Sequence, residues 1–414
     1  MREVSSRTLP SRWARFATVA GPGIVVMLAD TDAGSIITAA QSGAEWGYRL
    51  LLLQLILIPI LYLVQELTVR LGIVTGRGHG QLIRQHFGAP WAWISVATLI
   101  LSCMGALISE LSGIAGVGQL LGIPAWISMT IVIAGLTLMA YTGSYLTVER
   151  IAMAIGIFEL VFLAVAARAH PDPRALLDGA IHIPLSDPKY LYLVAANIGA
   201  VIMPWMVFYQ QSAVVEKGLT IGDLPAARAD TAIGAFVTQL IMAAVLIATA
   251  ATLGRSGRSE SLGTVQQIAE AITPFLGKRI GTTLFALGMI GAALVATIVV
   301  TLTAARTLGE IMGFKHSLEF HPREAPWFYG IYTVALSLGG LLIASGANLV
   351  KISVGVQVMN ALLLPIVLGF LYLLGRRALP ECHRLKGAHA FTTAAVIGTT
   401  AVFGVYAGLI GMFN

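Results

Sequence analysis

Two short stretches decide the fold: Asp30-Thr31-Asp32-Ala33-Gly34-Ser35 and Ala200-Val201-Ile202-Met203-Pro204-Trp205. Each interrupts an apolar run that is long enough to cross a membrane. In hydrocarbon every backbone N–H and C=O needs a partner, so a broken helix is tolerated only beside protein or a water-filled cavity. A carboxylate near the bilayer centre costs ~2.5–3.5 kcal/mol on insertion scales, so one without a function is rare. Two interrupted helices at corresponding positions in the two halves of a chain indicate a transporter's binding site.

The composition is that of a membrane protein. Hydrophobic residues make up 57% of the 414 residues, charged residues make up 11%, and the mean hydropathy is +0.83. Soluble domains contain about 25% charged residues, so a soluble enzyme is excluded. The net charge of +6 lies in short connectors, which favours a topological role over nucleic-acid binding. No nucleophile–base pair occurs in the apolar runs, and the two cysteines are too few for a disulfide framework or a zinc cluster.

Apolar runs of about 20 residues predict membrane-spanning helices, because ~30 Å of hydrocarbon requires that length. The sequence predicts eleven: 16–42, 47–72, 93–119, 124–146, 150–168, 189–215, 230–254, 279–305, 326–345, 350–375 and 390–412. We expect an all-α polytopic membrane protein with one transmembrane domain over 1–414. Helices 1 to 5 (16–168) and 6 to 10 (189–375) form two units, the second inserted upside down because each unit holds an odd number of helices. Helix 11 (390–412) is an appendage.

The distribution of positive charge predicts the orientation. Most of the 26 Lys and Arg residues lie in segments on the N-terminal side of the membrane. Positive segments stay in the cytoplasm, so we expect a cytoplasmic N-terminus and an extracytoplasmic C-terminus in a cell inner membrane. The first apolar run is too long for a signal peptide.

The break in helix 6 offers a free carbonyl and a sulfur atom. Pro204 has no N–H, so the carbonyl of Ala200 loses its helical partner. Met203 lies on the same face as Ala200. Taken alone, this pattern indicates a proline kink with a packing methionine. Opposite a carboxylate it indicates a metal site.

The break in helix 1 supplies that carboxylate. Asp32 and Ser35 are spaced i, i+3 and share one face, and Gly34 is expected to let the backbone unwind. A carboxylate, a hydroxyl and free carbonyls suit Mg²⁺ or Mn²⁺, whereas a thioether favours softer metals. Asp30 lies on a different face and either lines the access path or pairs with a neighbour. The two breaks predict Asp32, Ser35, Ala200 and Met203 as metal-site residues.

The chain resembles the NRAMP divalent-metal transporters in several motifs. The first helix carries Gly21-Pro22 and Asp32-Ala33-Gly34-Ser35 where the family has Asp-Pro-Gly-Asn, and the helix 6 segment resembles the family's Ala-x-x-Met-Pro-His. Further matches are Leu71-Gly72-Ile73, Gly76-Arg77, Glu110, Gly122-Ile123-Pro124, and Gln357 eight residues before Pro365. The resemblance implies the LeuT-like 5+5 inverted repeat with broken helices 1 and 6. It also implies transport of a divalent metal as cargo, with no cofactor. Gln357 is then a further predicted metal-site residue, and a hydrogen bond between helices is its alternative role.

Departures from the family pattern concern the ion and its coupling. The family's proline is Ala33, its coordinating asparagine is Ser35, and the histidine after Met-Pro is Trp205, which cannot titrate. Histidine is the usual group that exchanges protons near neutral pH. Few and short ligands leave room for water around an ion, and Mg²⁺ usually keeps several waters. This pattern resembles the NRAMP-related magnesium transporters.

Other polar residues in the apolar runs are predicted to lie along the pathway. They are Asp30, Glu110, Trp205, Gln210, Gln211 and Asn360. Hydrogen bonding between helices is the alternative explanation for the amides. The histidines of the polar connectors, including His79, are expected to be solvated.

The sequence therefore predicts a transporter that imports Mg²⁺, and also Mn²⁺, by alternating access with weak or no proton coupling. A proton-coupled Mn²⁺/Fe²⁺ importer is the alternative. A sodium-coupled organic-solute transporter and a non-transporting metal sensor are further alternatives. The expected partners are the divalent ion and the lipid bilayer, with no nucleic acid, and the working unit is expected to be a monomer.

Overall fold

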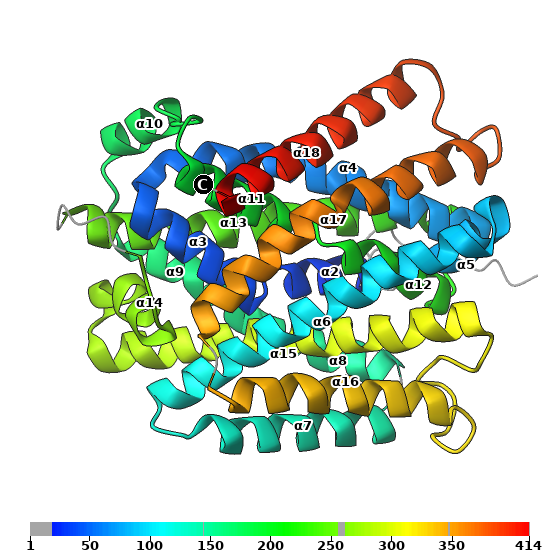
Figure 1. Cartoon of the computed structure of the whole chain (residues 1–414), viewed down its shortest axis with the longest axis horizontal. Coiled ribbons are helices and arrows are strands. Elements are labelled where there is room, and N and C mark those ends of the chain that lie inside the picture. The colour runs from blue at the N-terminus through cyan, green and yellow to red at the C-terminus, as the bar shows by residue number, and fades with distance from the viewer. Residues whose placement is uncertain (1–18, 144, 256–260, 347, 414) are drawn as a thin grey trace, which may run out of the picture.

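The computed structural model describes residues 19–143, 145–255, 261–346 and 348–413. Residues 16–18 and 144, which belong to the predicted first and fourth spans, lie outside the described residues. The described residues form helices and no strand (Figure 1). The first half contains α2 (Pro22–Asp30), α3 (Ala33–Trp46), η1 (Gly47–Leu50), α4 (Leu51–Thr75), α5 (His79–Phe87), α6 (Ala89–Leu120), α7 (Ala125–Thr142), α8 (Tyr145–Gly156), η2 (Ile157–Leu160), α9 (Val161–Arg168) and α10 (Pro173–Ile181).

The second half begins after α10. It contains α11 (Pro188–Val201), α12 (Pro204–Glu216), η3 (Ile221–Asp223), α13 (Leu224–Arg255), α14 (Val265–Ile272), η4 (Pro274–Leu276), α15 (Lys278–Met312), α16 (Pro326–Ala344), α17 (Leu349–Arg377) and α18 (Gly387–Phe413).

The described part of the chain has ten helical segments that are long and apolar enough to cross a membrane. One of them, Ala33–Thr75, is 43 residues long. At 1.5 Å per residue that is about twice the length needed for ~30 Å of hydrocarbon. It therefore holds parts of two crossings. The first crossing is α3 together with the preceding α2, and the second is α4. Counted in this way the fold has the eleven predicted crossings, which confirms the predicted all-α architecture.

The two predicted helix interruptions are confirmed. The first crossing is divided into α2 and α3, and the sixth into α11 and α12. The structure has a third interruption, which the sequence did not predict. It lies in the fifth crossing, where the 3₁₀ turn η2 separates α8 from α9.

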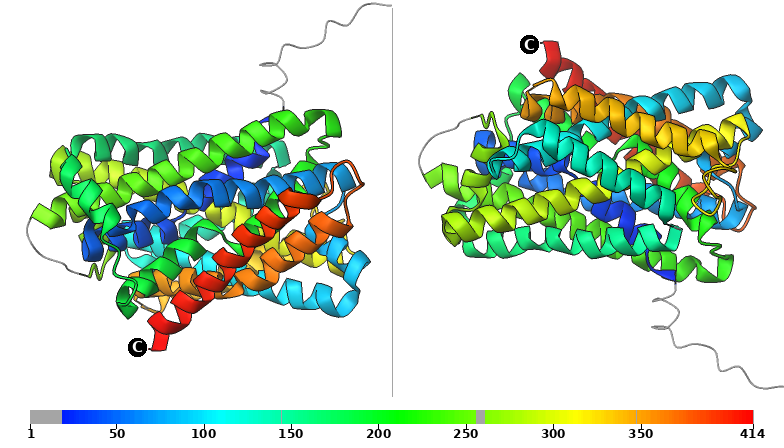
Figure 2. Two further views of the ribbon diagram at one scale, coloured as in Figure 1. Left: turned by 90° about the horizontal axis from the view of Figure 1, so that it is seen from above. Right: turned by 90° about the horizontal axis from the view of Figure 1, so that it is seen from below.

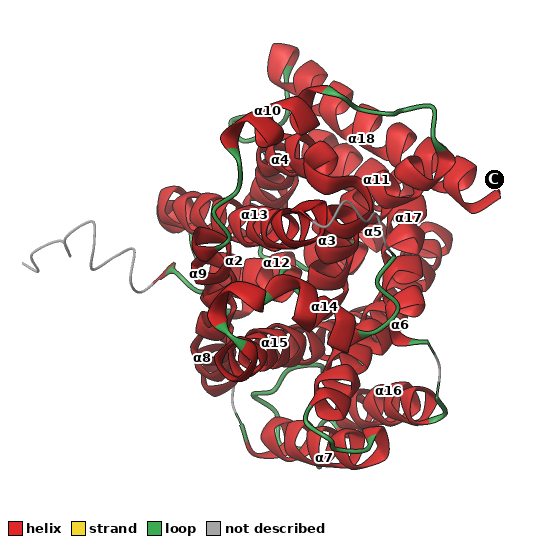
Figure 3. Cartoon of the chain, turned by 90° about the vertical axis from the view of Figure 1, so that its left-hand side faces the viewer, coloured by secondary structure: helices red, strands yellow, loops and turns green. Residues whose placement is uncertain are grey.

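The interrupted helices lie in the middle of the bundle. Seen nearly along the helices, α2, α3 and α12 occupy the centre, with α7 and α16 at one end and α18 at the other (Figure 3). α3 packs against α13, α17, α11 and α6. In the two further views the long helices run side by side across the whole molecule (Figure 2). The core therefore surrounds both helix breaks with protein, as broken helices in a membrane require.

Candidate metal-binding site

Asp32 makes the first helix break. It has extended backbone (φ −73°, ψ 172°) between α2 and α3, and its Oδ1 accepts a 2.6 Å hydrogen bond from the N–H of Ser35. A carboxylate in this N-cap position satisfies a free N–H and is favoured by the positive end of the helix dipole. One Asp32 oxygen thus holds the break in place, and Oδ2 is left for another partner.

The expectation that Gly34 lets the backbone unwind is wrong. Gly34 lies inside α3 and has helical backbone. A Cβ atom at this position would collide with the amide nitrogen of Gln357 and the hydroxyl of Ser109. The glycine is therefore needed for the close approach of α3 to α6 and α17.

The second break lies at Ile202 and Met203. Met203 has extended backbone (φ −86°, ψ 138°), and Pro204 begins α12, where its missing N–H costs nothing. Ala200 is in the last turn of α11, where carbonyls have no helical donor. The carbonyl of Ala200 accepts a 3.1 Å hydrogen bond from the hydroxyl of Ser35. The two breaks are thus in direct contact.

Several buried polar atoms at the first break have no hydrogen bond within the described part of the chain. They are Asp32 Oδ2, Glu110 Oε1, Ser109 Oγ and Gln357 Nε2. The Asp32 carboxylate interacts with the side chains of Glu110 and Gln357, and Glu110 Oε2 accepts a 2.9 Å hydrogen bond from the N–H of Ala33. A buried polar group left unsatisfied costs about 1–3 kcal/mol. Such a concentration of these groups fits a pocket that receives a polar ligand.

Asn360 orients Gln357. Its Nδ2 donates a 3.0 Å hydrogen bond to Gln357 Oε1, and its Oδ1 accepts a 2.8 Å bond from the hydroxyl of Ser102. All three side chains are buried. This chain fixes the amide of Gln357 next to Gly34.

Met203 and Trp205 contact each other. Trp205 Nε1 donates a hydrogen bond of 3.1 Å to the sulfur of Met203, and both side chains are fully buried. The sulfur is the only soft metal ligand of the predicted site, and in this structure it accepts the hydrogen bond from Trp205.

Gln210 and Gln211 lie further along α12 and make contacts away from the breaks. Gln210 Nε2 donates to the hydroxyl of Thr231 on α13 at 3.0 Å. Gln211 Nε2 donates to the carbonyl of Arg77 at 2.9 Å, and its Oε1 lies 2.9 Å from Nδ1 of His79. Both amides serve as hydrogen-bonding groups between helices in this structure.

The expectation that His79 is solvated is wrong. α5 folds against the bundle, and the imidazole is fully buried between Gln211 and Phe208, whose ring centroid lies 4.7 Å away. Burial lowers the pKa of His79 from 6.5 to about 4, although the hydrogen bond with Gln211 opposes this shift.

Glu159 is a buried acid that the sequence reasoning missed. It lies in η2, is fully buried, and interacts with Thr31 and Asp30 at the first break. Its signal was the same as that of Glu110, an acid in the middle of an apolar run. The described residues include no group of three or more His, Cys, Asp or Glu side chains arranged to hold a metal ion.

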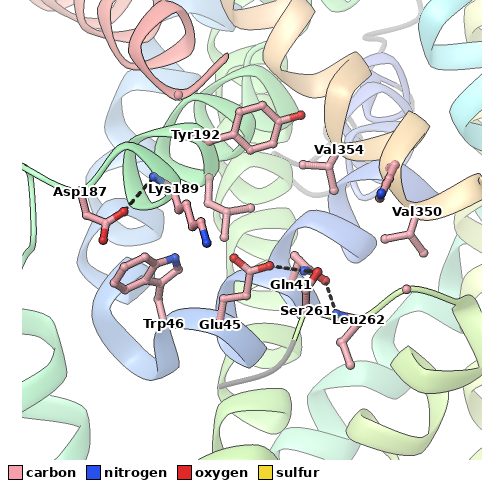
Figure 4. A pocket seen from close by; sticks show the side chains of 14 residues that line it. Gln41, Glu45, Trp46, Asp187, Lys189, Tyr192, Ser261, Leu262, Val350 and Val354 are labelled. Carbon is pink, nitrogen blue, oxygen red and sulfur yellow. Dashed lines mark hydrogen bonds between the residues drawn. The ribbon is translucent and has the colours of Figure 1, made fainter. Parts of the chain in front are cut away.

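A cavity of about 720 Å³ opens at one end of the bundle. Figure 4 shows Gln41 and Glu45 from α3, Lys189 and Tyr192 from α11, and Val354 from α17 around it. Asp32 and Ser35 are fully buried beneath this end, so the site is closed to the cavity.

The other end of the bundle is held by charged contacts. Asp230 accepts a 2.7 Å hydrogen bond from the N–H of Gly23 at the start of α2. Glu66 pairs with Arg70 and with Arg228, 2.7 Å away. These contacts hold α2 and α4 against α13 at this end.

The fold and the two joined helix breaks define a multi-pass membrane transporter, not an enzyme. The solved manganese transporter of Eremococcus coleocola, in complex with an aromatic bis-isothiourea substituted compound, superimposes with a TM-score of 0.76 at 20% identity, over 99% of this chain and 91% of that chain. MhsT in complex with L-phenylalanine gives a TM-score of 0.62 at 16% identity, over 95% and 97%. At these identities the likeness shows the fold alone, and it confirms the LeuT-like arrangement.

Residues 23–409 match the family described as natural resistance-associated macrophage protein-like, or Nramp. The chain belongs to the Nramp family. It is 27% identical over 420 residues to the divalent metal cation transporter MntH of Aeromonas hydrophila subsp. hydrophila, covering 97% of this chain and 98% of that protein. It is 28% identical over 345 residues to the MntH protein of Agrobacterium fabrum, covering 79% and 72%. The chain is thus a divalent metal cation transporter of the Nramp type.

Proposed function

We propose that this transporter imports Mg²⁺, and also Mn²⁺, by alternating access with weak or no proton coupling. The proposal includes membership of the NRAMP-related magnesium transporter branch and action as a monomer in the inner membrane. The N-terminus would be cytoplasmic and the C-terminus extracytoplasmic. Residues 16–168 and 189–375 would be the two repeats that move against each other, with 390–412 outside them.

The donor set at the joined breaks carries the proposal. Asp32 Oδ2, the Ser35 hydroxyl and the Ala200 carbonyl would surround the ion, with Glu110 beside them. Gln357 would contribute its Oε1, which already accepts a bond from Asn360, because its Nε2 is a hydrogen-bond donor and cannot ligate a cation. One ligating carboxylate with neutral oxygen donors suits a hard cation that keeps part of its water shell. The unsatisfied Asp32 Oδ2 is the observation that most directly supports an ion at this place.

The state of Met203 supports a hard ion. Its sulfur would lie at the edge of the site, where Trp205 already donates a hydrogen bond to it. A sulfur that accepts a hydrogen bond binds a soft metal less strongly than a free sulfur does. A free thioether would favour transition metals over Mg²⁺, so the hydrogen bond from Trp205 reduces that preference.

One observation supports weak proton coupling. Trp205, Gln210 and Gln211 cannot titrate near neutral pH. Uptake does not need coupling, because each positive charge gains ~2.3 kcal/mol per 100 mV of membrane potential and a divalent ion gains about twice that.

A proton-coupled Mn²⁺/Fe²⁺ importer is the second candidate. The names of the relatives favour it, since they are divalent metal cation transporters and a manganese transporter. Glu110 and Glu159 favour it as well, because they are buried carboxylates next to the site.

Flux into proteoliposomes with an internal pH dye separates the two candidates. Mg²⁺ uptake without acidification, lost in Asp32→Ala and kept in Asp178→Ala on exposed α10, would support the proposal. Mn²⁺ uptake with acidification and no Mg²⁺ flux would support the second candidate.

A further inference from the structure

A groove lies between α4 and α18 on the outside of the bundle. α4 packs mainly against α13 and α12, and α18 packs mainly against α11 and α17, so the two helices cover each other only in part. Two adjoining hollows of about 510 Å³ and about 160 Å³ follow this seam, and Ile56 of α4 lines both of them. α4, α18 and the short helix α10 lie on the same side of the molecule (Figure 3). The groove therefore faces the surrounding lipid.

The two walls of the groove are apolar and differ in the size of their side chains. On α4, Leu52, Ile56 and Leu63 are spaced i, i+4 and i+11 and share one face of the helix. On α18 the side chains opposite them are short, among them Ala395 and Thr399. The long side chains of α4 thus offer contacts to hydrocarbon, and the short ones of α18 leave the space for it.

The length of the groove matches one leaflet of a bilayer. From Leu52 to Leu63 the helix rises about 16 Å, at 1.5 Å per residue. Half of the ~30 Å hydrocarbon core is ~15 Å. One acyl chain of a lipid therefore fits along the groove from the membrane surface to the middle of the bilayer.

Arg49 lies at the surface end of the groove and is held in place by an aromatic pair. It lines the smaller hollow, and its guanidinium carbon is 5.7 Å from the centroid of the Trp46 ring. The hydroxyl of Tyr190 donates a 3.0 Å hydrogen bond to the carbonyl of Arg49, and the Tyr190 ring packs edge-on against Trp46 at 5.3 Å. Both the backbone and the side chain of Arg49 are thus positioned at the groove.

α10 indicates that Arg49 is at the level of the lipid headgroups. This helix packs against η1, which contains Arg49. Leu177 and Ile181 of α10 are 68% and 73% exposed, and Leu185, which follows α10, lines the groove. A short helix with exposed apolar side chains beside the ends of membrane-crossing helices lies in the interface between water and hydrocarbon.

The positive charge of Arg49 is available to a ligand. Its side chain is exposed, and none of the ion pairs between described residues involves it. A guanidinium group binds phosphate through two parallel hydrogen bonds, and basic residues at the membrane surface attract anionic lipids. The groove therefore offers an apolar channel and, at its surface end, a phosphate ligand.

We infer that the groove between α4 and α18 binds one anionic phospholipid, with its phosphate on Arg49 and an acyl chain along Leu52, Ile56 and Leu63. The bound lipid fills the space that α4 and α18 leave between them and links α18 to the first half of the chain. This site is separate from the metal site and does not depend on which ion is transported or on its coupling.

Native mass spectrometry of the purified full chain in detergent tests the inference. Dioleoyl phosphatidylglycerol is the anionic probe, and dioleoyl phosphatidylcholine, whose headgroup has no net charge, is the comparison. We expect wild type to bind one phosphatidylglycerol about tenfold more tightly than phosphatidylcholine, because only the first brings a net negative charge to Arg49. Arg49→Gln should remove this preference, and Arg279→Gln, at an exposed arginine of α15 away from the groove, should keep it.

A second pair of variants tests the apolar part of the groove. Thr399→Phe fills the groove from the side of α18 and should weaken the binding of both lipids. Thr392→Phe, at an exposed threonine of α18 that does not line the groove, should leave binding unchanged. Size-exclusion profiles and melting temperatures show that each variant is folded.

Three results would overturn the inference. The first is equal binding of phosphatidylglycerol to wild type and to folded Arg49→Gln. The second is unchanged lipid binding in Thr399→Phe, since the headgroup would then be held without a chain in the groove. The third is a dimer mass in wild type that disappears in Thr399→Phe, because a second copy of the chain would then occupy the groove. Loss of the preference in Arg49→Gln together with weaker binding in Thr399→Phe supports the lipid site.

Discussion

The hydroxyl of Ser35 donates a 3.1 Å hydrogen bond to the main-chain carbonyl of Ala200, so one side chain joins the two interrupted helices. The same serine donates its N–H to Asp32 Oδ1. A single turn of α3 therefore holds the carboxylate, the hydroxyl and the partner break in one arrangement. Any ion placed at Asp32 Oδ2 would be next to this junction.

Ser35→Ala should weaken Mg²⁺ binding about tenfold, since it removes an oxygen ligand and a hydrogen bond worth about 1 kcal/mol. Calorimetric titration of the purified protein measures the affinity. Ser112→Ala on α6, whose hydroxyl bonds only its own helix at Ile108, is the matched control and should leave the affinity unchanged. An unchanged affinity in Ser35→Ala would remove Ser35 from the site.

Gly34→Ala should lower both transport and stability. The added methyl group meets Gln357 and Ser109 in a packed core, and overpacking of this kind costs about 1–3 kcal/mol. Gly135→Ala in α7 has open space around its Cβ and should gain up to about 1 kcal/mol from helix propensity. Melting temperatures in detergent compare the two. Equal stability of both variants would contradict the close contact of α3 with α17.

Trp205→Phe should shift ion preference towards soft metals, because it removes the N–H that occupies the Met203 sulfur. Competition of Cd²⁺ with Mg²⁺ for binding measures the shift, and we expect Cd²⁺ to gain about tenfold relative to wild type. Trp327→Phe, at an exposed tryptophan, is the control. If Cd²⁺ gains nothing while the variant remains folded, the sulfur does not face the ion.

His79 should make the stability depend on pH. The folded state holds a neutral imidazole, because burial lowers the pKa of His79 to about 4, while the unfolded chain takes up the proton near pH 6.5. Between these two values the unfolded state binds more protons, so the stability falls by up to roughly 1.4 kcal/mol per pH unit as the pH is lowered.

Thermal unfolding at a series of pH values measures this effect, and the comparison of variants assigns it. His79→Phe should flatten the dependence between about pH 6.5 and about pH 4. His86→Phe, the partly exposed histidine of the same helix, should retain it. A slope that survives in His79→Phe would assign the dependence to other groups.

Much of the fold followed from the sequence for local reasons. Pro204 can only begin a helix or kink one, and a carboxylate in the middle of an apolar run is rare without a function, so both breaks could be predicted from the sequence. Hydropathy gave the crossings, because lipid imposes their length. The role of Gly34 was misjudged because its constraint comes from α17, which lies more than three hundred residues away along the chain.

The positions of His79 and Glu159 depend on tertiary packing. The segment around His79 is polar enough to be a solvated connector, and only its docking against Gln211 and Phe208 buries the ring. η2 gives no strong local signal, since Gly156 alone does not stop a helix. Glu159 is nevertheless an acid in an apolar run, like Glu110, and the same argument would have predicted that it is buried.

The reversal potential of Mg²⁺ flux tests uncoupled transport most directly. In proteoliposomes with fixed Mg²⁺ and pH gradients, net flux should vanish at the Mg²⁺ equilibrium potential, which is about 30 mV per tenfold gradient for a doubly charged ion. We predict that this potential stays the same when the pH gradient is varied. A reversal potential that moves with the pH gradient would contradict uncoupled transport and would establish proton coupling.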